Sequence, residues 1–176
     1  MSIHLRLADT ADQERLGGIE DAADSRLTEL FGPGEWSPSP SGAERAASPG
    51  FVLVSAETHA GPAVGFAHVV EQDDLAHLEQ LSVLPEHGRR GHGRALVDAA
   101  KREARSRGYR ELTLRTFADV PWNAPFYASC GFVEVVAATD FHHRLADRES
   151  ELGLTRLGRR ILMRAVLSEY GNVYRG

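Results

Sequence analysis

The chain has 176 residues, which is enough for one domain with a sizeable core and too few for two ordinary domains. Its 42% apolar and 26% charged residues are typical of a globular protein, and no apolar run is long enough to span a bilayer. The formal charge of −5 disfavours non-specific nucleic-acid binding, and the N-terminus lacks a basic-then-apolar signal, so we expect a cytoplasmic protein that binds neither nucleic acid nor membrane.

Cysteine and histidine usage gives no indication of a metal. The single cysteine, Cys130, excludes an internal disulfide, and the histidines are scattered without zinc-ligand spacing. His142 and His143 are adjacent and would point to opposite faces of a strand. We therefore expect no metal site, and we expect Cys130 to be a small buried residue and not a nucleophile.

The N-terminal third begins with a strand and a helix. Apolar and polar residues alternate over residues 3–7, and Asp9 with Thr10 then predicts the start of a helix that ends near Leu30. Residues 32–50 hold four of the eight prolines and predict a surface loop over an active site, with one or two helical turns at 41–47. Trp36 in this loop is either a packing anchor or part of a pocket.

Three strands are expected next. Residues 51–56 and 63–70 predict a hairpin, and the turn at 72–74 leads into a third strand. In that strand the apolar residues are Ala76 and Leu78, then Leu81 and Val83, so the two-residue period slips at Glu79 and Gln80. Such a slip predicts a β-bulge, from which the strand would splay away from its neighbour and leave unpaired backbone groups.

A glycine-rich loop follows this strand and leads into an amphipathic helix. The loop has glycines at 88, 91 and 93, and we expect the helix to run from Gly91 to about Arg107, with Gly108 as its C-cap residue. The first N–H groups of a helix have no internal partner and lie at the positive end of its dipole, so they favour an anion. Arg89, Arg90 and Arg94 would add positive charge. The pattern predicts a site for a phosphate or pyrophosphate.

Two better-known phosphate-binding loops do not fit this spacing. A P-loop has Lys and then Ser or Thr after its last glycine, whereas Arg94 and Ala95 follow Gly93. The dinucleotide fingerprint would need a third glycine where Leu96 stands. The alternative interpretation is that these glycines only turn a strand into a helix.

The remaining elements complete one mixed sheet. Leu112, Leu114 and Phe117 predict a strand parallel to the bulged one, because a helical crossover joins parallel strands. A short helix should start within 119–125 and stop before Gly131, followed by a strand at 134–138, a short helix at 144–151 and a last strand at 160–167. We expect a single α/β (α+β) domain over residues 1–170, with a mixed, mostly antiparallel sheet flanked by helices and a tail at 171–176.

These residues together resemble a known family. Residues 78–96, with Trp122 to Tyr127 and the pair Gly131 and Phe132, are similar to the GCN5-related N-acetyltransferases (GNAT), which transfer acetyl from acetyl-coenzyme A to an amine. The similarity extends from Ile3 to about Val166. In that family the segment Q/R-x-x-G-x-G/A cradles the pyrophosphate of coenzyme A, and the corresponding residues here are Gly88, Arg89, Arg90, Gly91, His92 and Gly93. Gly88 departs from the pattern, which removes one side chain and leaves the backbone amides.

The resemblance also implies roles for other residues. Tyr127 would be the acid that protonates the leaving thiolate, and Asn123, with Phe126 beside it, would help to hold the pantetheine arm. The backbone of Leu81, Ser82 and Val83 would polarise the thioester. Glu79 is our first choice of base, directly or through water, with His68, Asp119, His142 or ordered water as alternatives. Read without the family, Tyr127 could be a core aromatic residue and Glu79 a solvated or salt-bridged carboxylate.

The leading hypothesis is therefore an acetyl-coenzyme A dependent N-acetyltransferase. Its acceptor would be an amine of a small molecule or protein, bound by the first helix, the proline-rich loop and the segment after Ala138. A coenzyme-binding sensor without turnover is the alternative, and the family also makes a homodimer possible.

Overall fold

One seven-stranded sheet organises the computed structural model, in which residues 2–32 and 39–167 are described. Its strand order is β1-β2-β3-β4-β5-β7-β6, and every neighbouring pair is antiparallel except β4 and β5, which are parallel as expected. The strands are β1 (His4–Leu7), β2 (Gly50–Ala56), β3 (Gly65–Gln72), β4 (Leu75–Val83), β5 (Glu111–Phe117), β6 (Val133–Val135) and β7 (Arg160–Val166). The predicted mixed, mostly antiparallel sheet is confirmed.

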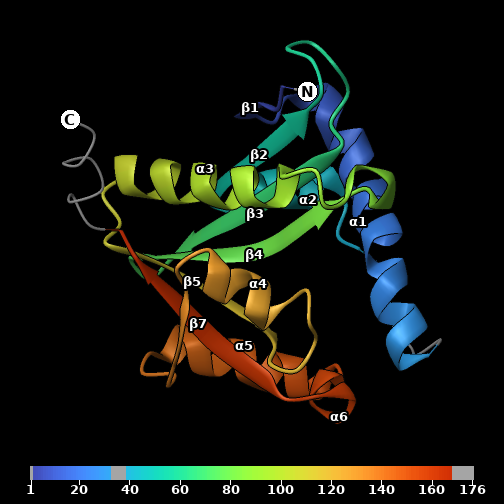
Figure 1. Cartoon of the computed structure of the whole chain (residues 1–176). Coiled ribbons are helices and arrows are strands. Elements are labelled where there is room, and N and C mark those ends of the chain that lie inside the picture. The colour runs from blue at the N-terminus through green and yellow to red at the C-terminus, as the bar shows by residue number, and fades with distance from the viewer. Residues whose placement is uncertain (1, 33–38, 168–176) are drawn as a thin grey trace, which may run out of the picture.

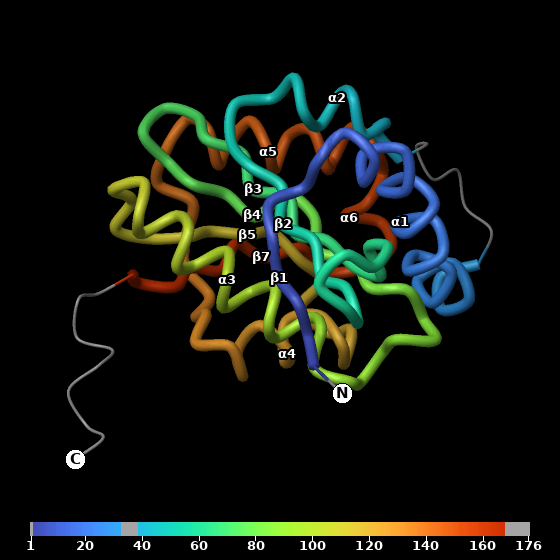
Figure 2. The backbone as a smooth tube through the Cα atoms, turned by 90° about the horizontal axis from the view of Figure 1, so that it is seen from above, coloured from blue at the N-terminus to red at the C-terminus, as the bar shows by residue number. Residues whose placement is uncertain are grey.

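Helices cover both faces of this sheet (Figures 1 and 2). Those among the described residues are α1 (Thr10–Phe31), α2 (Gly42–Ala47), α3 (His92–Ser106), α4 (Ala124–Ser129), α5 (Asp140–Glu151) and α6 (Leu154–Leu157), with a 3-10 turn at Pro85–His87. Seen from above, α3 and α4 lie on one side of the strands, and α2 and α5 lie on the other (Figure 2). No helix in the described part of the chain is both long and apolar enough to cross a membrane.

The alternation along the strands builds a core on each face. Leu53 of β2 packs in the core under α3, together with Leu96 and Ala100 of that helix. Its neighbour Val54 points the other way, into a smaller core with Leu16 of α1. Because the face changes at each residue of a strand, one strand supplies both layers.

The ends of the two long helices follow the capping signals in the sequence. The Asp9 carboxylate accepts a hydrogen bond from the Asp12 backbone N–H at 3.0 Å, and the Asp12 carboxylate accepts one from the Asp9 backbone N–H at 3.0 Å, which starts α1. At the end of α3, Gly108 has φ 95°, and the N–H of Tyr109 donates to the carbonyl of Ala104 at 3.1 Å. Both predicted boundaries are confirmed, as is the short helix α2.

Two predictions for the C-terminal third were wrong in extent. β6 ends at Val135 and does not reach residue 138, and Val136 is 90% exposed. α5 begins at Asp140 and not at 144, because the Thr139 hydroxyl accepts from the His142 N–H at 3.2 Å and caps the helix. His142 and His143 therefore lie on a helix, and the argument from strand faces does not apply to them. The prediction for Trp36 lies outside the described residues.

The β-bulge in β4 is confirmed at the predicted place. His68 of β3 pairs with Gln80 and Val69 pairs with Leu78, so Glu79 has no partner in the ladder. On its other side β4 pairs with β5 only at positions 76–78. Beyond the bulge the two parallel strands separate, and that edge of β4 has no partner strand.

Candidate active site

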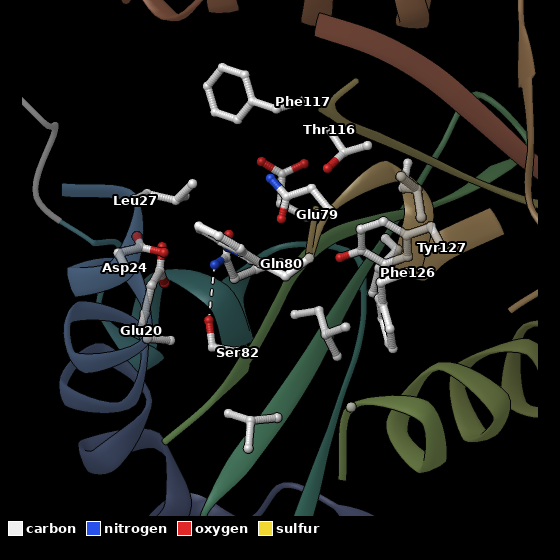
Figure 3. Close-up of a pocket in the computed structure, with 18 of the residues that line it drawn as sticks. Glu20, Asp24, Leu27, Glu79, Gln80, Ser82, Thr116, Phe117, Phe126 and Tyr127 are labelled. Carbon is white, nitrogen blue, oxygen red and sulfur yellow. Dashed lines mark hydrogen bonds between the residues drawn. The ribbon is translucent and has the colours of Figure 1, made fainter. Parts of the chain in front are cut away.

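A cleft of about 1140 Å³ opens where β4 and β5 separate. Its walls come from α1, the C-terminal half of β4, the start of α3, the end of β5, α4 and α5. In Figure 3, side chains of α1 face Phe126 and Tyr127 across this space, with Glu79 and Gln80 between them. The volume exceeds that of an ordinary small-molecule pocket and suits a long ligand.

The α3 end of the cleft has exposed backbone donors. Gly91 is the N-cap of α3 with φ 92°, and no side chain caps this helix. Arg89 also has a positive φ, 61°, so the loop turns its backbone sharply before the helix begins. The first N–H groups of α3 thus remain available to an anion, and they lie beside Gly93, which lines the cleft.

The three arginines of the loop do not all converge on this point. Arg89 and Arg94 line the cleft, but the Arg94 guanidinium donates to the Ser129 carbonyl oxygen at 3.0 Å and to its hydroxyl at 2.8 Å, which ties α3 to α4. Arg90 lies 3.4 Å from the Glu57 carboxylate and, like His92, is not part of the cleft wall. The backbone N–H groups are therefore the main candidate donors to an anion in this loop.

α4 presents a tyrosine hydroxyl to the cleft. The ring of Tyr127 packs edge-on against Phe126, with centroids 5.2 Å apart, and against Phe132 at 5.9 Å. Its oxygen points into the cavity (Figure 3). Burial raises the pKa of Tyr127, so the phenol is protonated at neutral pH. Asn123 is the N-cap of α4 and also lines the cleft.

The bulge places Glu79 at the floor of the same cleft. Leu78 and Leu81 both pack toward α3, so the extra residue leaves Glu79 and Gln80 on the opposite face. The Glu79 side chain is open to the cleft but closely surrounded by protein, and this loss of hydration raises its pKa, although Arg45 acts in the opposite direction. A carboxylate whose pKa is raised toward neutrality is suited to accept a proton.

For the α1 side of the cleft, the sequence predicted only that the first helix contributes and did not predict which of its residues do so. Leu27 of α1 and Phe117 of β5 give it an apolar wall, and Asp24 adds a carboxylate whose pKa burial raises to about 6. Among the described residues no ion pair is formed by Asp24. Glu149 of α5, by contrast, is bonded by Arg115 at 2.9 Å and by Arg160 at 2.6 Å.

The alternative bases lie in different places. Asp119 is exposed and does not line the cleft. His142 is buried at hydrogen-bond distance from Thr113, 3.1 Å, and Thr139, 2.9 Å, outside the cleft. His68 lies on β3 opposite Gln80 and lines a second, smaller cavity.

One cluster contains side chains of the kinds that bind metal ions, which the spacing of these residues in the sequence did not indicate. Glu57, His87 and His92 have candidate metal-ligand atoms within 4.8 Å of one another, although 35 positions separate the first from the last. The Arg90 guanidinium shares Glu57 with this cluster. Only the fold brings these residues together, because Glu57 follows β2, His87 precedes the glycine loop and His92 is the first residue of α3.

Comparison with known proteins places this geometry in a family. The family model described as Acetyltransferase (GNAT) family matches residues 20–132, which include β4, the glycine loop, α3 and α4. The chain belongs to the GNAT acetyltransferase family.

Solved structures of other GNAT proteins have the same fold. The ribosomal-protein-S18-alanine N-acetyltransferase of Escherichia coli is 23% identical with a TM-score of 0.67, and 99% of this chain aligns with 100% of that one. A GNAT acetyltransferase of Staphylococcus aureus Mu50 is 13% identical with a TM-score of 0.71, over 95% of this chain and 100% of that one. PaiA N-acetyltransferase of Thermoplasma acidophilum, in complex with coenzyme A, is 18% identical with a TM-score of 0.63, over 94% and 99%.

Proposed function

We propose that this GNAT protein is an acetyl-coenzyme A dependent N-acetyltransferase that transfers the acetyl group to a primary amine of a small molecule or protein. One observation carries the proposal: the uncapped start of α3, the unpaired edge of β4 and the Tyr127 hydroxyl face one cleft. In acetyl-coenzyme A, the pyrophosphate would need the start of α3, the amide-containing arm would need the edge of β4, and the thioester would need the Tyr127 hydroxyl.

The donor fits the cleft on physical grounds. The α3 N–H groups would bind the pyrophosphate, since Gly91 holds the left-handed conformation that lets the backbone approach it. The arm would lie along the unpaired edge of β4, with backbone groups of residues 81–83 bonded to it as a partner strand would be. Asn123 would fix the arm from the α4 side.

The chemistry then needs a base, an oxyanion donor and an acid. Glu79 takes a proton from the acceptor ammonium, and the free amine attacks the carbonyl carbon. A backbone N–H of β4 stabilises the charge that develops on the carbonyl oxygen. The carbon–sulphur bond breaks, and Tyr127, kept protonated by its raised pKa, gives its proton to the sulphur.

An amine screen tests the proposal. Purified protein with acetyl-coenzyme A and a library of amines should release free thiol above the rate of spontaneous hydrolysis, with acetylated product detected by mass spectrometry. The library should include a peptide with an N-terminal alanine, because the Escherichia coli relative in the fold comparison acts on the ribosomal protein S18 alanine. Coenzyme binding without release from any amine would favour the sensor alternative and overturn the catalytic proposal.

A further inference from the structure

A second cavity of about 230 Å³ adjoins the cleft. It shares four wall residues with the cleft: Glu20, Pro40, Glu79 and Gln80. Its other walls include Arg45 of α2 and His68 of β3. Because liquid water occupies about 30 Å³ per molecule, this chamber has room for several waters.

Two residues of the chamber wall have buried side-chain nitrogens without a partner among the described residues. His68 is 4% exposed, and neither of its ring nitrogens has a hydrogen-bond partner among the described residues. Arg45 is 3% exposed, and its Nε also lacks a partner, although its Nη2 bonds to Glu20. Leaving such groups without a partner is costly, so their presence at one cavity points to bound water or to a function.

The bulge connects Glu79 to both cavities. His68 is paired with Gln80, the residue next to the bulge, so the imidazole lies on the same face of the sheet as the Glu79 side chain. Glu44 also lines the chamber and is exposed, so the chamber reaches the protein surface at this residue. A route thus runs from Glu79 through the His68 site to solvent.

We propose that this chamber carries the proton taken up by Glu79 out of the active site, and that His68 relays it. This inference rests on the proposed function, since it assumes that Glu79 is the base. A neutral imidazole has one acceptor and one donor nitrogen, so it can receive a proton on one side and release another from the other side.

Each step balances. The acceptor ammonium gives its proton to the Glu79 carboxylate, the amine nitrogen bonds to the acetyl carbon, and the thiolate takes the Tyr127 proton. The Glu79 carboxylic acid then gives its proton to water in the chamber. That water passes a proton to one nitrogen of His68, and the other nitrogen releases one toward Glu44 and solvent.

The charges around the chamber favour passage and not storage of the proton. The groups that face His68 are Arg45 and Glu44 from α2, Glu20 from α1, and Glu79 with Gln80 from β4. Burial, with Arg45 nearby, lowers the pKa of His68 to about 4, so the ring is neutral at physiological pH. The same Arg45 favours ionised Glu79, which promotes its return to the carboxylate after each turnover.

Chemical rescue tests the relay. His68→Ala should lower kcat by about tenfold or more, since positioned proton transfer contributes roughly 10²–10⁴-fold. Imidazole added to the buffer should restore kcat in a saturable manner, while the Kd for acetyl-coenzyme A stays within about twofold. His68→Gln, which keeps hydrogen-bonding capacity but cannot exchange protons this way, should remain slow and should not recover with pH.

Matched variants separate this role from a structural one. Imidazole should not restore Glu79→Gln, which lacks the base, or His142→Ala, which removes a buried histidine bonded to Thr113 and Thr139 outside both cavities. Full kcat in His68→Ala, or recovery in His68→Gln without imidazole, would overturn the relay and leave the proposed function intact. A wild-type protein with no amine-dependent thiol release would instead overturn the proposed function.

Discussion

At the scale of single residues, the Tyr127 hydroxyl gives the sharpest test of the chemistry. Tyr127→Phe keeps the ring that packs against Phe126 and Phe132, so the fold and the coenzyme site should be retained. We expect kcat for amine-dependent thiol release to fall by about 10²-fold, because the leaving thiolate loses its proton donor. The Kd for acetyl-coenzyme A should change by less than about twofold. Unchanged turnover would remove Tyr127 from the mechanism.

Asp24 predicts a pH-dependent stability. Its folded-state pKa of about 6 lies above its ordinary value of 3.8, so the folded protein holds this proton more tightly than the unfolded chain. The Asp24 carboxyl therefore costs no stability below pH 3.8, its ordinary pKa, and it destabilises the fold as pH rises through about 6. Asp24→Asn should raise the free energy of unfolding by about 1–2 kcal/mol at pH 7 and by little at pH 3.5.

Urea denaturation at the two pH values measures this effect, with Glu14→Gln as the control because Glu14 is an exposed carboxylate on the same helix. The control should change stability by less than about 0.5 kcal/mol at either pH. Equal stability of Asp24→Asn and wild type at pH 7 would contradict the burial of this carboxyl. Because Asp24 faces the cleft, acceptor binding measured with Asp24→Asn also tests whether the Asp24 carboxylate contributes to that binding.

Sequence reasoning identified some of these residues and not others for a physical reason. The slip in alternation marks the position of Glu79 in the sequence, and the resemblance to the GNAT family implies the roles of Glu79 and Tyr127. Asp24 lies on a long helix whose polar residues look alike in sequence, and only the packing of α1 across β4 shows which of them faces the cleft. The sequence offers His68 only as one of several alternative bases, and only the fold places it at the same cavity as Arg45 of α2.

At the scale of elements, the loop before α3 depends on a left-handed glycine at its last position before the helix. Gly91 has φ 92°, which an L-residue adopts only with strain, whereas its missing Cβ would meet only Ile3 at 3.5 Å. Gly91→Ala should therefore lower the free energy of unfolding by about 1–3 kcal/mol and weaken acetyl-coenzyme A binding by about tenfold or more. Calorimetric titration well below the variant's Tm separates the two effects.

Gly17→Ala is the matched control for that variant. Gly17 lies inside α1 with open space around its Cα, so alanine should add about 0.5–1 kcal/mol of stability and leave coenzyme binding unchanged. If Gly91→Ala bound the coenzyme as well as Gly17→Ala does, the loop would not be the pyrophosphate site.

Elements with strong local signals were predictable, and those held by tertiary contacts were less so. The slip in alternation at Glu79, the capping residues at the start of α1 and the glycine at the end of α3 are local signals, and the structure confirms them. α5 has a weak apolar stripe, with Phe141 and His142 buried near its start, so its first turn was not predicted although Thr139 carries a capping signal. β6 pairs with β7 over three residues only, and the sequence does not show where this strand ends.

At the scale of the whole molecule, the topology was predictable because a helical crossover between β4 and β5 requires a parallel pair. The cleft was predictable only at the end where we propose that the coenzyme binds. The proposed acceptor side joins α1, the end of β5 and α5, which are more than 100 residues apart at the extremes, and no local pattern encodes their meeting. The choice of acceptor is therefore determined by how these elements pack, and no sequence motif indicates it.

The central claim is that this cleft binds acetyl-coenzyme A, and a thermal titration tests it most directly. A ligand that binds only the folded state at 100 times its Kd adds about 2.7 kcal/mol, which for a chain of this size raises Tm by roughly 5–11 °C. We predict a rise of this order for wild type, growing with the logarithm of the ligand concentration above Kd, and a smaller rise for Gly91→Ala at the same concentrations. An unchanged wild-type Tm at millimolar acetyl-coenzyme A would contradict the account.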